Sequence, residues 1–377
     1  MKKTVWVLLV SAVIIFMLSI SVSASAKSDF SELDGFVETL PEQFKEEIES
    51  SEGEDKIEKL ENAVIKMSSG EQMLSKLIEA IGLQAESVLK LFFAICALLI
   101  LSSMFRTASS SFDNDALTSA VRFCSTGALF ATVVYTQYSH FERVESFFES
   151  LGSLMNAMIP ITATVWAIGG NIGCASVGSA SLYLMLNVCE GLFGLSVIPV
   201  CSVMSVLGLC DAMSDEMKTG RLLGAIKKIY GFFLGIVMTV LVSSLAAQTS
   251  ISAAADSTAA RTVRMMSGSF IPVLGGSIGE TLRTVSGGVV YLKNVFGFGG
   301  VLMIAGTLLP VAISLLLTRI VFLITAGLAD ILGCPNESRL LENLGDTFGT
   351  MLAVCVSVSV MFVLALCIFM QSIVAVA

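Results

Sequence analysis

The sequence predicts an all-α, polytopic membrane protein, and three features of its composition support that fold class. Hydrophobic residues make up 55% of the 377-residue chain, and charged residues only 14%. Soluble domains carry roughly 25% charged residues. The mean hydropathy is +0.85, so a single globular core cannot hide this many apolar side chains and lipid must cover the rest.

The amino terminus predicts a cleavable signal peptide at residues 1–26. Two lysines precede an apolar run at residues 5–22 and an A-x-A ending at 24–26, which is the pattern of a secretory signal. We expect cleavage after Ala26; the alternative is an uncleaved first membrane helix. In either case residues 27–84 reach the far side of the membrane. That segment holds 15 acidic and 6 basic residues, which accounts for the whole net charge of −9.

The later part of this exported segment predicts a small amphipathic helix. Its apolar residues recur at spacings of three, four and seven, which places them on one helix face. They are Ile57, Leu60, Val64, Met67, Leu74, Leu77, Ile78 and Ile81. Two roles are open for this face: packing on the chain's own membrane domain, or binding a partner outside the membrane.

Residues 85–377 predict a multi-span membrane domain of about six to nine membrane segments, since a spanning helix needs about 20 apolar residues. The clear spans are residues 88–104, 229–247, 301–317 and 351–374. The weaker ones are 120–138, 151–169, 174–190 and 192–210. The last two could instead form one long helix broken near Gly191 and Gly194, with Glu190 either at a membrane interface or at mid-membrane.

Charge and glycine spacing predict orientation and packing. The densest basic loop, Lys218 to Lys228, is expected to face the cytoplasm by the positive-inside rule. Glycine pairs with G-x-x-x-G spacing let helices approach closely. They occur at Gly169/Gly173, Gly231/Gly235, Gly275/Gly279 and Gly345/Gly349. The pair Gly231/Gly235 lies in a clear span and is the one most expected to pack.

Residues 248–293 are small, polar and rich in glycine, unlike the rest of the membrane domain. Residues 248–264 fit either a solvated extracytoplasmic connector or, with the glycine-rich stretch 269–293, a re-entrant pair at membrane depth. Irregular backbone survives at that depth only when protein shields it or it lines a wet cavity. Glu280 and Arg283 are the expected ion pair there, because charges at membrane depth pair with one another.

No catalytic, cofactor-binding or metal-ligating set is predicted, so we expect no enzyme. The G-x-S-x-G match at residues 275–279 would need a strand-to-helix turn and a histidine base. The only histidine is His140, which is expected at an interface in a structural role. The chain has no P-loop and no C-x-x-C pair, and its nine cysteines are expected to be inert buried thiols.

Residues 253–300 carry a distinctive order of motifs. An aspartate and two arginines precede an F-I-P-V-x-G-G core, then an acidic residue and an L-K-N-x-x-G-x-x-G ending. This region resembles the signature of the stage III sporulation protein AE family, except that the family often has aspartate where this chain has Glu280. The resemblance implies the candidate site residues Asp256, Arg261, Arg264, Pro272, Gly275, Gly276, Glu280, Lys293, Asn294, Gly297 and Gly300.

The resemblance also implies a role that composition alone does not give. Members of the family are membrane subunits, similar to a permease or export platform, of a channel-like complex between mother cell and forespore. That complex supports endospore development and late forespore gene expression. The implied partners are the other proteins of the stage III sporulation A operon, including a secretion-type ATPase and ring-forming subunits, and a forespore-made channel protein.

The implied location is the mother-cell membrane around the forespore, with the N-terminal segment in the intermembrane space. No nucleic-acid partner is expected. Within the signature, Arg264, Glu280 and Lys293 are the expected functional polar groups. The alternative function is a stand-alone small-solute transporter.

Overall fold

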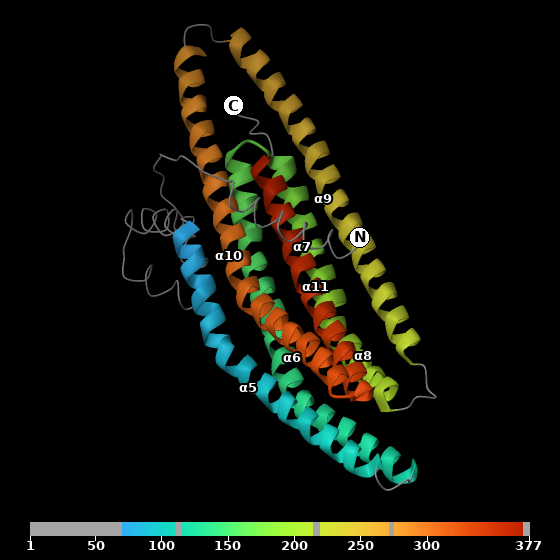
Figure 1. Ribbon diagram of the computed structural model, residues 1–377. Helices are drawn as coiled ribbons and strands as arrows, with labels where there is room; N and C mark the ends of the chain where they lie inside the picture. The colour runs from blue at the N-terminus through green and yellow to red at the C-terminus, as the bar shows by residue number, and fades with distance from the viewer. Residues whose placement is uncertain (1–69, 111–114, 214–218, 271–274, 372–377) are drawn as a thin grey trace.

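Long helices form an elongated bundle (Figure 1). The computed structural model describes residues 70–110, 115–213, 219–270 and 275–371, and every element in these ranges is helical. Helices are what an apolar chain requires, because lipid cannot satisfy backbone N–H and C=O groups. The signal peptide and the exported residues up to 69 lie outside the described ranges.

The described helices form six columns. A column here is one long helix, or a series of consecutive helices that follow one another without a turn. The first two are α5 (Gly70–Ser110) and α6 (Asp115–Ile168). The third consists of η1 (Cys174–Gly178), α7 (Ser179–Cys189), η2 (Glu190–Gly194) and α8 (Leu195–Met213). The last three are α9 (Gly220–Phe270), α10 (Gly275–Ile331) and α11 (Pro335–Gln371).

Each of the six described columns contains a stretch that is long and apolar enough to cross a membrane. This confirms an all-helical fold compatible with a polytopic membrane protein. The first column also joins two predicted parts, because α5 runs without a break from Gly70 into the apolar stretch at Gln84–Ser109. Part of the predicted amphipathic helix is therefore continuous with the first span.

The second column merges two predicted spans into one helix. α6 has 54 residues, or about 80 Å of helix, against a hydrocarbon core of about 30 Å. Its charged middle does not form a loop, because that segment is itself amphipathic. Val144, Phe147 and Phe148 are buried there, whereas Glu142 and Glu145 are exposed.

The third column takes the form of one long broken helix, which the sequence left open as an alternative. The break is the π-helical segment η2, between α7 and α8. Glu190 begins it and is exposed, with its carboxylate beside Gly152 of α6. This chain segment therefore changes to a π-helix at the predicted glycines without leaving the helical conformation.

Two glycine turns connect columns through the same hydrogen-bond pattern. At the end of α6, Gly170 has φ 77°, and the N–H groups of Gly170 and Asn171 donate to the carbonyls of Ala167 and Trp166. At the end of α10, Gly333 has φ 71°, with equivalent bonds at 3.1 and 2.8 Å. This is the Schellman motif, in which glycine takes the left-handed conformation at low cost.

Close helix packing uses different glycines from those expected. Gly231 and Gly235 of α9 are exposed, and open space surrounds the position of a Cβ at each. The expectation that this pair packs helices within the chain is therefore wrong. Gly345 and Gly349 of α11 are buried against α10 instead, where a Cβ at Gly349 would lie 2.8 Å from the Arg319 guanidinium carbon.

The glycine-rich stretch is also more regular than expected. α9 continues to Phe270 and α10 begins at Gly275, and the two helices rise beyond the rest of the bundle (Figure 1). The expectation of irregular backbone is wrong for the described parts of residues 248–293, whereas their re-entry into the membrane stays a prediction. A single glycine costs a helix only about 1 kcal/mol relative to alanine, which does not stop a long cooperative helix.

Alanine substitution is predicted to change the free energy of unfolding in opposite directions at two glycines, one in the α10–α11 turn and one within α10. Gly333→Ala is expected to lower the free energy of unfolding by about 1–2 kcal/mol, because an alanine is forced into the left-handed conformation. Gly327→Ala, at an exposed helical position with open space around it, is expected to raise it by about 0.5–1 kcal/mol. Thermal or denaturant unfolding of the detergent-solubilised variants measures both, and equal effects would contradict the turn geometry.

Candidate functional site

The first acidic residue of the signature, Asp256, joins α9 to the start of the third column. One carboxylate oxygen accepts a hydrogen bond of 3.0 Å from the N–H of Gly173, and the other accepts one of 3.0 Å from the N–H of Cys174. These N–H groups begin a helix and have no partner within it. A negative charge is favourable at that position, because the helix dipole is positive there.

The contact between Asp256 and the start of the third column requires a glycine at position 173. A Cβ at Gly173 would lie 2.8 Å from Oδ1 of Asp256, which is too close for two unbonded atoms. Gly173 therefore leaves room for the carboxylate of Asp256. It does not act, as expected, as half of a helix-packing pair with Gly169. We call Asp256, Gly173 and Cys174 the carboxylate cap.

Further contacts surround the cap. Cys174 is fully buried, and its thiol lies 3.7 Å from the carbonyl oxygen of Thr249 on α9. About two helical turns further on, the Ser181 hydroxyl donates to the side-chain oxygen of Gln248. Side chains thus also tie the third column to the part of α9 that precedes Asp256.

A second signature residue, Lys293 of α10, lies at the same end of the bundle. Its side chain is only 4% exposed and is close enough to Cys174 to interact with it electrostatically. Asp256 and Lys293 are 37 positions apart in sequence, yet both lie near Cys174. The structure therefore brings two of the predicted polar residues together around the start of the third column.

The two glycines that end the signature allow α10 to approach its neighbours. A Cβ at Gly297 would collide with the Met370 side chain of α11. A Cβ at Gly300 would lie 2.8 Å from Leu366 of α11 and 3.0 Å from Met158 of α6. These positions fix how closely α10 packs just below Lys293.

The other candidate residues are only partly placed. Gly275 and Gly276 are the first residues of α10. Pro272 and the side chains of Arg261, Arg264, Glu280 and Asn294 lie outside the described part of the structure. The predicted pairing of Glu280 with Arg283 falls there too and stays a prediction.

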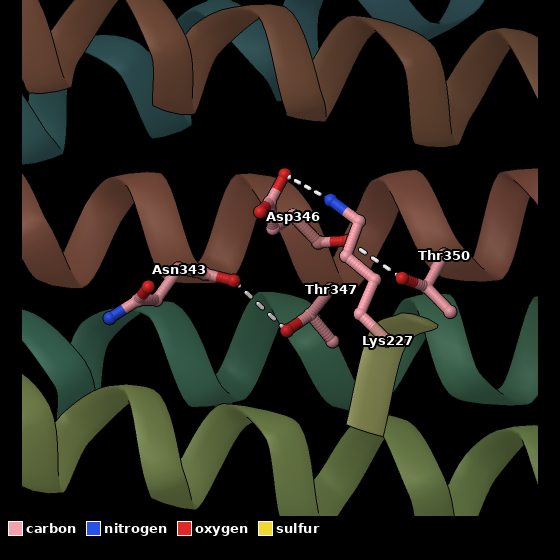
Figure 2. Close-up of polar contacts among 5 residues, drawn as sticks. All are labelled: Lys227, Asn343, Asp346, Thr347 and Thr350. Atoms are coloured by element: carbon pink, nitrogen blue, oxygen red, sulfur yellow. Dashed lines mark hydrogen bonds and ion pairs between the residues drawn. The ribbon is translucent and has the colours of Figure 1, made fainter. Parts of the chain in front are cut away.

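Sequence reasoning missed a second polar cluster, which lies near the opposite end of the bundle. Figure 2 shows Lys227 reaching from α9 to Asp346 of α11, with an Nζ–Oδ1 distance of 2.6 Å. Thr347 and Thr350 bond back to the carbonyls of Asn343 and Asp346, both at 3.0 Å (Figure 2). Asp346 is the last charged residue of α11 before its long apolar stretch, and this was the signal that could have identified it.

His140 is placed differently from the expectation of an interfacial residue. It is 6% exposed, between α6 and α10, and its two ring nitrogens lie 3.2 Å from the Ser314 hydroxyl and 3.1 Å from the Thr318 hydroxyl. Its ring also packs edge-on against Phe348 of α11. Burial is possible because both nitrogens have hydrogen-bond partners.

Glu337 is another buried polar residue that the sequence did not single out. It is 1% exposed at the start of α11, and one carboxylate oxygen accepts bonds from Ser102 at 2.7 Å and Ser125 at 2.6 Å. A single side chain therefore ties α5 and α6 to the α10–α11 turn. Its position in the first turn of α11 also suits a negative charge.

These sites fix helix ends and helix packing. Both oxygens of Asp256 are engaged by backbone N–H groups, so this carboxylate is used for capping. With six apolar columns in the described residues, the arrangement is compatible with a polytopic helical membrane protein, and its signature residues anchor one end of the bundle.

Comparison with known proteins gives the family. The sequence profile of the family described as Stage III sporulation protein AE matches residues 54–372, so the chain belongs to that family. The chain is similar to the Stage III sporulation protein AE of Bacillus subtilis (strain 168), with 23% identity over 224 residues. The match covers 59% of this chain and 56% of that relative, so it spans a little over half the relative's length. No solved structure matches.

Removal of the carboxylate cap is predicted to destabilise the fold and to expose Cys174. Asp256→Ala is expected to lower the free energy of unfolding by about 1–3 kcal/mol, because two N–H groups lose their acceptors. It should also increase the rate at which Cys174 reacts with a maleimide, followed by mass spectrometry. Asp330→Ala, at an exposed residue of α10, is the control. Unchanged Cys174 protection in Asp256→Ala would count against the cap.

The ion pair between Lys227 and Asp346 (Figure 2) predicts that exchanging both charges recovers the stability lost by reversing one of them. Lys227→Asp places two carboxylates together and should lower the free energy of unfolding by up to about 1 kcal/mol, since both partners are partly exposed. Adding Asp346→Lys should recover most of that loss. Denaturant titration of the unmodified chain and the two variants at low and high salt tests this, and a double variant no better than the single one would refute the pairing.

Proposed function

We propose that this protein is a non-enzymatic membrane subunit, similar to a permease or export platform, of a channel complex between mother cell and forespore. The observation that carries the proposal is membership of the Stage III sporulation protein AE family over residues 54–372. The six apolar columns support it, because they suit a subunit embedded in a bilayer. The role in the complex comes from the family resemblance.

The charge distribution supports an orientation for this subunit. Arg106 and Arg122 lie where α5 ends and α6 begins, and Arg221 lies at the start of α9. By the positive-inside rule this end faces the mother-cell cytoplasm. The carboxylate cap, at the far end of α6 and α9, then lies on the extracytoplasmic side, together with the exported N-terminal segment.

This orientation gives the signature a role. The tips of α9 and α10 extend beyond the other helices (Figure 1), and the cap and Lys293 hold the bases of these tips. We infer that the tips face the intermembrane space, where partners from the sporulation operon or the forespore can bind. The signature residues would then set the direction in which the tips project.

Two measurements separate this role from a stand-alone transporter. Co-purification of sibling subunits from sporulating cells supports the channel subunit. Solute flux through proteoliposomes that contain only the purified chain would instead support the transporter. Flux without any co-purifying subunit would overturn the proposal.

Substitution in the signature tests the role in sporulation. Glu280→Ala, at normal protein level, is expected to block sporulation after engulfment, because the tip of α10 would lose a signature charge where partners are proposed to bind. The measurement is the number of heat-resistant spores in cultures of the endospore-forming organism that encodes the protein. Glu342→Ala, at an exposed residue of α11, is the control. A normal spore count for Glu280→Ala would argue against the assignment.

A further inference from the structure

An exposed stripe of aromatic and acidic residues runs along the middle of α6. Its members follow one another at spacings of three and four, so they share one helix face. They are Tyr135, Tyr138, Glu142, Glu145 and Glu149. The two tyrosines are 84% and 64% exposed, and the three carboxylates form no salt bridge with any described residue.

The surroundings make lipid an unsuitable cover for this acidic stripe. Residues 123–141 and 150–168 of α6 contain no Asp, Glu, Lys or Arg, and each forms about 28 Å of helix. The carboxylates lie between these two apolar stretches, at the centre of the candidate span Ser119–Ile168. Charged side chains within spans face protein or water, because exposure to lipid is costly.

A second stripe, on α9, is complementary to the acidic stripe of α6 in charge and in side-chain size. It consists of small and basic residues, also at spacings of three and four. They are Arg221, Gly224, Lys228, Gly231 and Gly235, all exposed except Gly224, which is half-buried. Open space surrounds the position of a Cβ at each of the three glycines, so another helix can come close to the backbone here.

Contacts with α11 place the two stripes at the same height. The His140 ring of α6 lies 5.1 Å from the Phe348 ring, and Lys227 of α9 pairs with Asp346. Asp346 and Phe348 differ by about 3 Å in height and point about 200° apart on α11. His140 and Lys227 are therefore level with each other, on opposite sides of α11.

Counting along the helices from this level aligns the two stripes. Glu142 is level with Gly231, and Glu145 is about level with Gly235. Lys228 lies about one turn below the level of Glu142, within reach of a long side chain. Large and acidic residues on one side of the molecule thus correspond in height to small and basic residues on the other.

We propose that the acidic stripe of α6 binds the glycine stripe of α9 in a second copy of this chain. Opposite charges and complementary side-chain sizes favour this pairing, whereas two α6 stripes would place like charges together. The two surfaces differ and lie on opposite sides of the chain, so each copy can contact two others. Copies in one membrane share an orientation, and such a head-to-tail contact gives a ring where the rotation between copies closes and an open row where it does not.

The test uses two differently tagged copies of the full chain, expressed together and extracted from membranes in mild detergent. The unmodified copies are expected to co-isolate. Glu142→Lys and Lys228→Glu, each present in both copies, should reduce co-isolation to background at normal protein level. The double variant should restore it, because the charges are exchanged across the contact.

A steric pair complements the charge swap. Gly231→Leu should abolish co-isolation by blocking the approach of α6, without disturbing the chain's own fold, since the site is open. Gly327→Leu, an equally open glycine of α10, should leave co-isolation intact. Co-isolation retained by Gly231→Leu, or not restored by the double charge variant, would overturn the proposal; water or another protein would then cover the stripes.

Discussion

The architecture depends on one constraint: backbone hydrogen bonds must be completed inside the protein wherever lipid surrounds it. Long helices meet this requirement along their length, so the open N–H and C=O groups are concentrated at helix ends. The structure satisfies these ends locally. Gly170 and Gly333 close the ends of α6 and α10 through Schellman turns, and Asp211 accepts a bond of 2.6 Å from the N–H of Gly220 at the start of α9.

The carboxylate cap meets the same requirement across a long distance in sequence. Asp256 satisfies two N–H groups that begin the third column, and in doing so it fixes where α9 passes that column. Lys293 lies near the same turn, and Gly297 and Gly300 let α10 pack closely just below it. The family signature therefore acts mainly as a set of packing and capping positions around one end of the bundle, where α9 and α10 extend beyond the other helices (Figure 1).

Sequence patterns predicted the fold class and most apolar stretches, and the failures have physical causes. Glycine-rich residues 275–293 continue a helix, because the cost of each glycine is small beside the cooperativity of α10. The charged middle of α6 is helical because its apolar residues keep the helical period, which a hydropathy average does not detect. G-x-x-x-G spacing also identified glycines without saying which face is buried, so Gly231/Gly235 was chosen over Gly345/Gly349.

For the site, the sequence singled out Asp256, Lys293, Gly297 and Gly300 through the family resemblance, but it gave no partner for any of them. Gly173 and Cys174 carry no sequence signal of their own as N–H donors to the Asp256 carboxylate. His140 was placed at an interface because it lies among polar residues, and only the tertiary structure supplies Ser314 and Thr318 as its partners.

The sequence by itself determined that this is a helical, apolar chain of the sporulation family, compatible with a membrane protein, because composition and motif order depend on residue identity alone. The tertiary structure decided which helices are continuous, which glycines are buried and which polar groups meet. These outcomes depend on contacts between residues far apart in the chain, such as Asp256 with Gly173 and Lys227 with Asp346. Neither local propensity nor spacing encodes such contacts.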